Sequence, residues 1–333
     1  MTDGLRAWAV DGLGEVRRGT AIVDLLDGVA LADGDVVCVT SKVVSKAEGR
    51  RRRQDRDEAV EEETVRVVAR RGPTRIVENR LGLVMAAAGV DASNTEPGTV
   101  VLLPLDPDAS ARDLREQVLA RQGVNVAVVV TDTAGRAWRT GQTDLAIGVA
   151  GLEPLEPFAG AADGYGNPLV VTAPAVADEL AGLSELVTGK LGQRPVSVVR
   201  GLGGRVLPPG QHGPGAVVLQ RPRGQDMFAL GAREAVVAAV RGRDVECFGT
   251  PAEARELIDA LVSCGLEATA VVADSGVSVQ VRLDAGGPGR AGVRDQVVAL
   301  ERARAVCHAH GWRPFSDTGE AGGDAVTFSP VDP

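Results

Sequence analysis

The feature that most constrains the fold is an apolar run that stops abruptly at a cluster of charged side chains. Residues 126–131 read Val-Ala-Val-Val-Val-Thr, a β-branched run that is typical of a strand buried on both faces. The next segment, Asp132 to Asp144, changes at once to carboxylates, hydroxyls, guanidinium groups and an amide. Because ligand sites of open α/β sheets lie just beyond the carboxyl ends of strands, this strand-to-loop junction is a candidate site.

Two chemical roles suit the charged residues of this segment. Asp132 and Asp144 can hold a divalent cation, and Arg136 and Arg139 can bind phosphate or carboxylate groups. The alternative is a polar loop that caps the strand and pairs its arginines with nearby acids, which is common at such junctions. The segment taken alone does not decide between these interpretations.

Length and composition narrow the class of protein. At 333 residues the chain exceeds a typical single domain, so we expect two domains. Aromatic residues make up only 3% of the chain, so the core must consist mainly of Val, Ala and Leu. The net charge of −9 argues against a nonspecific nucleic-acid partner, which needs a basic surface.

The compartment is predicted from what the sequence lacks. It shows neither a secretory leader nor an apolar run of membrane-spanning length, so we expect a cytoplasmic protein with no membrane partner. The four cysteines are widely spaced without a paired-ligand pattern, which argues against structural zinc and a disulfide framework. Cys38 lies within an apolar run and is expected to be a small buried side chain.

The pattern of apolar residues predicts both helices and strands. Strands are expected at residues 35–40, 74–77, 83–88, 100–103, 126–131 and 196–199, and helices at 55–71, 109–122 and 176–188. The character changes from about residue 240, where helices are expected at 251–264 and 293–310 and strands at 269–272 and 277–283. These signals predict a small α/β module over residues 240–333.

A second candidate cluster follows the strand expected at 35–40. Ser41, Lys42 and Lys46 offer a hydroxyl and two point charges, which suit a polyphosphate. A solvated basic loop is the alternative, and this segment alone slightly favours it. The chain contains no Walker-type phosphate loop and no dinucleotide-binding glycine motif after a strand.

A third cluster lies in residues 89–94, where Asp91 and Asn94 stand three residues apart. The commoner use of such a pair is an Asx turn or a helix cap. As a site, the pair would offer one metal carboxylate and one amide that contacts a base or a phosphate. The three histidines (His212, His308 and His310) have no companion ligand set, and we interpret them as ordinary surface residues.

The three clusters share the chemistry of phosphoryl transfer. Carboxylates can hold Mg²⁺ or Mn²⁺, and cationic side chains can neutralise phosphates. Such a reaction needs little covalent help from the protein, and the sequence offers no obvious nucleophile.

Several longer motifs resemble those of the coenzyme F-420-0:L-glutamate ligase family. They are Ser41-Lys42 with residues 46–49, residues 89–94, residues 103–104 with 106–112, residues 132–148, and residues 177–180 with 189–190 and 195–201. The motifs occur in the correct order across residues from about 8 to 230, which is roughly two thirds of the chain.

The resemblance implies a fold and an activity. The fold is an unusual α+β arrangement, the gamma-glutamyl ligase-type fold, over residues 1–235, and it forms a homodimer. The activity is a GTP-dependent ligation of L-glutamate to the deazaflavin precursor of coenzyme F-420. In this family the γ-phosphate of GTP activates the carboxylate of the precursor's phospholactyl tail. The glutamate amine then attacks the acyl phosphate, and further glutamates can follow through γ-linkages.

The resemblance also implies roles for individual residues and cations. Asp91 and Asp132 would ligate Mg²⁺ or Mn²⁺, Thr133 would help at a second metal, and K⁺ is an optional further cation. Asp132 would act in catalysis, with Arg136 and Arg139 as anion contacts. The implied GTP contacts are Gly12, Leu13, Gly14, Glu15, Ser41, Lys42, Lys46, Asn94, and the turn from Thr188, Gly189 and Lys190 to Pro195.

The chain departs from the family pattern at three places. Lys190 stands where some members have an acidic metal ligand, and Leu81-Gly82 stands where a His-Gly pair is expected. Residues 240–333 are too few for the flavin-binding nitroreductase domain of many actinobacterial relatives, so we expect ligation without reduction. A packing or oligomerisation role is expected for this module. The first two departures support an alternative function, a non-catalytic deazaflavin- or nucleotide-binding protein.

Overall fold

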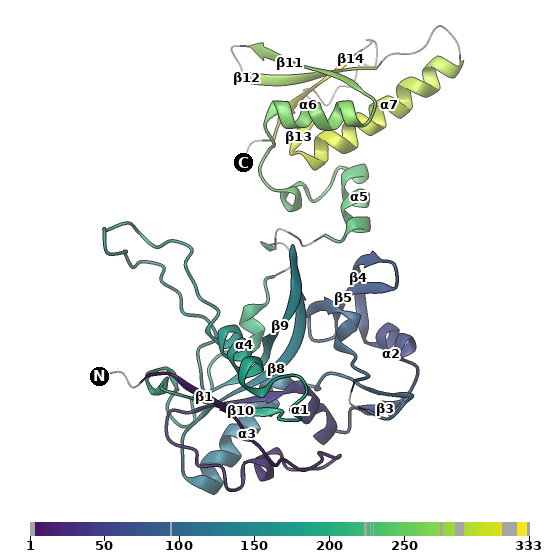
Figure 1. Cartoon of the computed structure of the whole chain (residues 1–333). Coiled ribbons are helices and arrows are strands. Elements are labelled where there is room, and N and C mark those ends of the chain that lie inside the picture. The colour runs from purple at the N-terminus through teal and green to yellow at the C-terminus, as the bar shows by residue number, and fades with distance from the viewer. Residues whose placement is uncertain are drawn as a thin grey trace. The chain divides into compact units, whose positions relative to one another are not determined.

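The computed structural model describes residues 4–331 except 94, 223–224, 227, 229, 274–275, 284–289 and 315–324. The chain divides into two compact units, Met1–Gln220 and Arg221–Pro333 (Figure 1). The first unit contains all the candidate site residues. Asn94 lies outside the described residues, so its expected role stays a prediction.

The first unit is built on a mixed five-stranded sheet with the strand order β1-β10-β2-β8-β9. Its strands are β1 (Arg6–Ala9), β10 (Val196–Arg200), β2 (Val36–Thr40), β8 (Ala127–Arg136) and β9 (Arg139–Ala150). Strands β2 and β8 are parallel, and the other neighbouring pairs are antiparallel. The strands expected near residues 35, 126 and 196 are therefore confirmed.

Helices cover both faces of this sheet (Figure 1). On β2, Val37 and Val39 pack in the core that includes α3 (Pro107–Gln122). Val36 and Cys38 pack on the opposite side with α4 (Val176–Thr188). Because both faces are covered, residues 36–39 of β2 and 127–130 of β8 form continuous apolar runs instead of alternating. Cys38 is fully buried, as expected.

The ends of α3 follow ordinary capping rules. Asp106 accepts a hydrogen bond from the backbone N–H of Ala109 at 2.9 Å, which caps the first turn of α3. Gly123 ends this helix in the left-handed conformation, with φ of 70°. The expected helices at 109–122 and 176–188 are thus confirmed with almost the same boundaries.

The segment after Thr131 is a β-hairpin, so its prediction as a loop was wrong. Strand β8 continues to Arg136, and β9 returns from Arg139 with Thr133 opposite Asp144. The strand persists because Ala134, Asp144 and Ala146 remain buried between cross-strand hydrogen bonds. The polar composition misled the prediction because the other side chains of the hairpin face solvent or a cavity.

The helix expected at residues 55–71 was also wrong over its second half. Helix α2 spans only Arg56–Glu63, and the chain then forms strand β4 (Thr64–Arg71). The hydroxyl of Thr64 donates to the carbonyl of Val60 at 2.6 Å where the helix ends. The β-branched residues of 64–68 favour the strand that follows.

Smaller strands form two further sheets in this unit. Strand β4 pairs with β5 (Thr74–Asn79), which pairs with β6 (Val84–Ala86), while β3 (Arg51–Arg53) pairs with β7 (Thr99–Val101). The strand expected at 83–88 ends at Ala86, because Ala87 and Ala88 adopt positive φ angles in the 3-10 helix η2 (Ala87–Gly89). The remaining short helices are α1 (Ser41–Ala47), η1 (Ile22–Leu26), η3 (Gly203–Arg205) and η4 (Ala216–Leu219).

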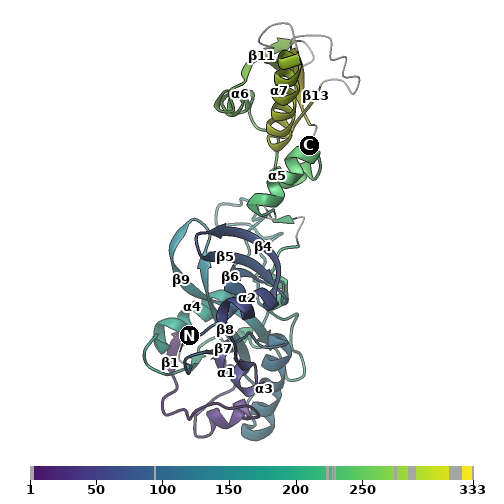
Figure 2. The ribbon, with the colours of Figure 1, turned by 90° about the vertical axis from the view of Figure 1, so that its right-hand side faces the viewer.

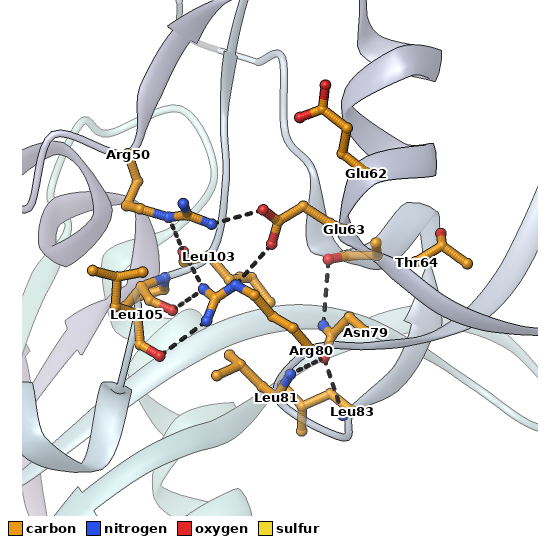
Figure 3. Close-up of polar contacts among 12 residues, drawn as sticks. Arg50, Glu62, Glu63, Thr64, Asn79, Arg80, Leu81, Leu83, Leu103 and Leu105 are labelled. Atoms are coloured by element: carbon orange, nitrogen blue, oxygen red, sulfur yellow. Dashed lines mark hydrogen bonds and ion pairs between the residues drawn. The ribbon is translucent and has the colours of Figure 1, made fainter.

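A buried polar network joins α2 and β5 to the segment before α3 (Figure 3). The Glu63 carboxylate accepts from Arg50 and from Arg80, each at 2.8 Å. Arg50 also donates to the carbonyl of Leu103 at 3.0 Å, and Arg80 donates to the carbonyl of Leu105 at 2.9 Å. Arg50 lies between α1 and β3, so the network fixes these smaller sheets against α1.

A long arm leaves the sheet after β9, over residues 153–175 (Figure 1). It pairs with itself, because the N–H of Phe158 donates to the carbonyl of Thr172 at 2.9 Å. At its tip, the Asp163 carboxylate accepts from the N–H groups of Tyr165 and Asn167, each at 2.9 Å. Backbone and side-chain hydrogen bonds therefore order this arm, although it contains no regular helix or strand.

The second unit has a four-stranded sheet with two helices against it (Figure 2). Its elements are α5 (Ala232–Arg241), η6 (Val245–Phe248), α6 (Ala254–Ser263), β11 (Glu267–Ala273), β12 (Gly276–Arg282), α7 (Arg290–Ala309), β13 (Trp312–Pro314) and β14 (Ala325–Pro330). The expected alternation of helices and strands is confirmed, and the strand pairs are antiparallel. Leu261, Val281 and Phe328 lie in its core. Within the described part of the chain, no helix is long and apolar enough to cross a membrane.

Candidate functional site

The parallel pair β2 and β8 brings two candidate segments to one edge of the sheet. Thr40 lies opposite Thr131, so the residues that follow, Ser41 and Asp132, become neighbours. The hydroxyl of Ser41 donates to Oδ1 of Asp132 at 2.6 Å. The carboxyl ends of parallel strands meet at one edge of a sheet, which is where a ligand site is expected in such folds.

A cavity of about 830 Å³ opens at this edge and contains most of the expected site residues. Those that line it are Leu13, Gly14, Glu15, Ser41, Lys42, Lys46, Asp91, Asp132, Thr133, Thr188, Gly189 and Lys190. They come from segments spread over nearly 180 residues of the chain, which the fold gathers around one space.

Gly12, Arg136 and Arg139 are not among the lining residues. Both arginines lie at the exposed end of the β8–β9 hairpin, where Arg136 donates to the carbonyl of Thr140 at 3.2 Å. Their expected contact with an anion therefore stays a prediction.

Asp132 shares the lining of the cavity with two other carboxylates, Asp144 and Asp91. Burial raises the pKa of Asp132 to about 7, and the charges of Asp144 and Asp91 act in the same direction. The Ser41 hydrogen bond and the Lys42 charge offset part of this effect. A cation placed beside Asp132 would relieve the repulsion and favour its ionised form.

Asp144 is already satisfied by neighbouring hydroxyls. Its oxygens accept from Thr131 at 3.1 Å and from Thr133 at 2.7 Å. Asp144 is 9% exposed and holds the hydroxyls of Thr131 and Thr133 in place. The carboxylate pair that faces the cavity more openly is Asp91 with Asp132.

Asp91 forms an ion pair with Lys42 across the cavity. It lies opposite Val101 of β7 in an isolated bridge, so the smaller sheet holds its position. Its Oδ2 atom lies 2.5 Å from Nζ of Lys42, and its Oδ1 atom accepts from the N–H of Ser93 at 2.6 Å. The Asx turn considered from the sequence is therefore present in the structure, together with a salt bridge.

The other lysines of the cavity have different surroundings. Lys46, one turn after Lys42 on α1, has no hydrogen-bond or ion-pair partner among the described residues. Burial lowers the pKa of Lys46, and the charges of Lys42 and Arg51 lower it further. Lys190 donates to the Thr133 hydroxyl at 3.1 Å and lies 4.0 Å from the Glu185 carboxylate.

Sequence reasoning missed several residues of the cavity. Arg56, Gln142 and Glu185 also line it. Arg56 was assigned to a charged helix and Gln142 to a loop, so neither prediction gave these side chains a direction. Gln193 and Arg194, which also line the cavity, belong to the turn up to Pro195 for which the resemblance implies GTP contacts. Ser93 contacts Lys42, and it stood in a quoted motif without an assigned role.

Two acidic residues of the family motifs, Glu48 and Asp108, do not line the cavity but hold neighbouring segments of the chain together. Glu48 accepts from the N–H of Leu105 at 2.7 Å and from the Ser110 hydroxyl at 2.8 Å. Asp108 accepts from the N–H groups of Val149 at 2.8 Å and Ala216 at 2.6 Å. These contacts link α1, α3 and β9, which carry or support the site.

Comparisons with known proteins agree with the resemblance. The sequence model of the family described as F420-0:Gamma-glutamyl ligase matches residues 14–201. A coenzyme F420:L-glutamate ligase of Archaeoglobus fulgidus is 38% identical over 220 residues, which cover 60% of this chain and 88% of that protein. The Methanopyrus kandleri protein of the same name is 39% identical over 210 residues, covering 56% of this chain and 83% of that protein.

A third relative, the coenzyme F420:L-glutamate ligase of Haloarcula marismortui, is 38% identical over 223 residues. Those residues cover 59% of this chain and 87% of that protein. The matched residues include the strands, α1 and the hairpin that build the cavity. The chain belongs to the F420-0:gamma-glutamyl ligase family.

Proposed function

We propose that this protein is a GTP-dependent ligase that joins L-glutamate to the deazaflavin precursor of coenzyme F-420. Membership of the family and the names of the relatives support the ligation of glutamate. The structural observation that carries the proposal is the cavity itself. It places Asp91 and Asp132 beside Lys42, Lys46 and Lys190, a combination suited to phosphoryl transfer.

The oxygen ligands of the cavity fit a divalent cation that arrives with a nucleotide. The described residues contain no group of three or more His, Cys, Asp or Glu side chains that could hold a metal on its own. Mg²⁺ is usually bound by one or two carboxylates together with water and substrate phosphates. Asp91 and Asp132 would hold Mg²⁺ or Mn²⁺, Thr133 offers a hydroxyl oxygen at a second position, and K⁺ would be a further cation.

The cation would neutralise the phosphate oxygens, and the residues of the chain would orient the reactants. Lys46 and Lys190 would contact the phosphates of GTP, and Ser41 would keep Asp132 oriented through its 2.6 Å hydrogen bond. Transfer of the γ-phosphate to the carboxylate of the precursor would give an acyl phosphate and GDP. The amine of glutamate would then displace phosphate and lose a proton as the amide forms.

The alternative function is a non-catalytic deazaflavin- or nucleotide-binding protein. Its specific support is the contact of Lys190 with Thr133, because an ammonium group lies where the resemblance implies a second metal. Tight binding of GTP without any product would favour this alternative.

The decisive experiment is incubation of the purified protein with the deazaflavin precursor, L-glutamate, GTP and Mn²⁺, followed by mass spectrometry. We expect products that differ by glutamate residues, together with GDP and phosphate. ATP in place of GTP and Asp132→Asn are the matched controls, and both should lower product formation strongly. Product formation without any nucleotide would contradict the proposed mechanism.

Sedimentation of the same sample tests the homodimer that the resemblance implies, and fractionation of the source cells tests the cytoplasmic location.

A further inference from the structure

All three N–H bonds of the Lys42 ammonium group are used inside the protein. Its Nζ lies 2.5 Å from Oδ2 of Asp91, 2.9 Å from Oγ of Ser93 and 3.1 Å from the carbonyl oxygen of Ser93. A lysine ammonium has three donors and no acceptor. With these three contacts in place, Lys42 has no donor left for a phosphate.

The Asp91 carboxylate is occupied in the same way. Oδ1 accepts from the N–H of Ser93 at 2.6 Å, and Oδ2 accepts from the Ser93 hydroxyl at 2.9 Å as well as from Lys42. A carboxylate surrounded by donors is a cation site, and Lys42 is the cation in it.

Lys46 shows that this arrangement is particular to Lys42. Both lysines line the same cavity and lie one turn apart on α1. Lys46 has no partner among the described side chains and backbone groups, so its three donors are available to an anion. The helix thus presents one free ammonium group and one that is held by oxygen atoms.

The held group can be exchanged. The side chain of Lys42 is 21% exposed and that of Asp91 is 41% exposed, so water and ions reach the pair. A lysine ammonium is a point charge on a flexible four-carbon stem, and it can move without any change in α1. A divalent cation at the Asp91 oxygens would repel the ammonium group and replace the charge that it supplies.

We propose that the Lys42 ammonium occupies a cation position at Asp91, and that a divalent cation binds there by displacing it. The displaced group is then free to donate to a phosphate of the nucleotide. Cation binding and nucleotide binding are coupled through this one side chain, and the coupling acts equally in both directions. This inference rests on the cation and nucleotide site of the proposed function.

The test is the affinity of the full chain for Mn²⁺ without nucleotide, with free Mn²⁺ measured by electron paramagnetic resonance. Lys42→Met removes the competing charge and keeps the length of the side chain, so we expect Mn²⁺ to bind about tenfold more tightly. Lys46→Met is the matched control, because it removes the same charge one turn away. Its Mn²⁺ affinity should stay within about threefold of the wild-type affinity, an effect of distant charge alone.

A double variant tests whether the gain in Mn²⁺ affinity depends on Asp91. Adding Lys42→Met to Asp91→Asn should give no gain over Asp91→Asn alone, because the carboxylate that both cations share is gone. A gain that persists in the double variant, or an equal gain in Lys42→Met and Lys46→Met, overturns the proposal. Lys42→Gln serves as a second neutral variant, and thermal unfolding checks that each variant is folded.

The ligase assay separates this inference from the proposed function. If the wild-type protein forms the amide while Lys42→Met binds Mn²⁺ no more tightly, the displacement of Lys42 is wrong and the proposed function stands. If Lys42→Met binds Mn²⁺ more tightly but the wild-type protein forms no product, the cation exchange stands and the proposed function is wrong.

Discussion

Strand β2 has an acid–base pair at each end, and the two pairs are built differently. Before the strand, Asp35 accepts two hydrogen bonds from Arg200, each at 2.7 Å, and is 0% exposed. The guanidinium group of Arg200 also lies over the ring of Trp8, 5.1 Å from its centre. After the strand, Lys42 meets Asp91 through a single carboxylate oxygen at the edge of an open cavity.

The difference separates a structural pair from an exchangeable one. Arginine offers a planar fork that matches a carboxylate with two bonds, whereas lysine offers a mobile point charge. At the Asp35 end, the pair and the N–H of Ala32 satisfy a carboxylate that no ion can reach. At the Lys42 end, the same types of charge remain accessible. We therefore expect the first pair to determine stability and the second to determine ligand binding.

The largest effect is expected at the exchangeable end. Asp91→Asn removes a proposed cation ligand, and kcat/KM for glutamate ligation should fall about thousandfold, or about 4 kcal/mol of transition-state stabilisation. Stability should change by less than about 1 kcal/mol, because exposed ion pairs contribute little. The measurements are product formation by mass spectrometry and thermal unfolding. A large loss of stability with unchanged activity would reverse the comparison.

The opposite outcome is expected at the buried end. Asp35→Ala removes three hydrogen bonds to a buried carboxylate and should cost about 3 kcal/mol of unfolding free energy. For a unit of this size the unfolding temperature should fall by roughly 6–12 °C. Activity assayed well below that temperature should stay close to the wild-type value, because Asp35 lies at the other end of the strand. Loss of activity in protein that is still folded would show that the two ends are coupled.

A third variant makes the exchangeable pair resemble the buried one. Lys42→Arg places a guanidinium fork beside Asp91, which can hold the carboxylate through two bonds. Mn²⁺ should then bind about threefold more weakly than in the wild-type protein when no nucleotide is present. This change is opposite in sign to the one expected for Lys42→Met. An equal gain in affinity for both variants would mean that side-chain size, and not the competing charge, controls the site.

At the carboxyl end of β2, the sequence predicted one contact better than another. Ser41 and Asp132 each follow an apolar run, and their proximity follows once the two strands are parallel neighbours. The contact between Lys42 and Asp91 spans about fifty residues and depends on the small sheet that holds Asp91 opposite Val101. Nothing in the local pattern of either segment encodes that distance, so the pair could not be predicted.

The hairpin error had a consequence for the candidate site. As members of a loop, Arg136 and Arg139 were free to fold back toward Asp132. As members of a hairpin they lie at its far end, because each residue of a strand advances the chain by about 3.3 Å. A strand whose polar side chains face a cavity has the same composition as a loop. In this segment only the buried positions Ala134 and Asp144 distinguish the strand from a loop.

The smallest effect is expected at Asp178, a half-buried acid that has no cationic partner among the residues that the structure describes. Its Oδ1 accepts from the N–H of Ala146, at 2.9 Å, beside the bulge where β9 passes Thr131. Burial raises the pKa of Asp178, and that hydrogen bond offsets the shift only in part. The folded-state pKa therefore lies above the unfolded value, so the ionised carboxylate reduces stability once the pH exceeds its ordinary pKa. The loss grows until the pH passes the folded-state pKa and is then constant.

Asp178→Asn should remove this dependence, so the variant should gain stability relative to the wild-type protein as the pH rises from about 3.5 to 7. Asp163→Asn gives the opposite sign as a control. Hydrogen bonds from Asn167 and Tyr165 lower the pKa of Asp163, so its ionised form stabilises the arm above the ordinary pKa. Thermal unfolding of Asp178→Asn and hydrogen exchange of the arm in Asp163→Asn measure the two trends. If stability changed with pH in the same direction in Asp178→Asn and Asp163→Asn, burial without a cationic partner would not be what destabilises Asp178. The contrast between Asp35 and Asp91 would then lose its electrostatic basis.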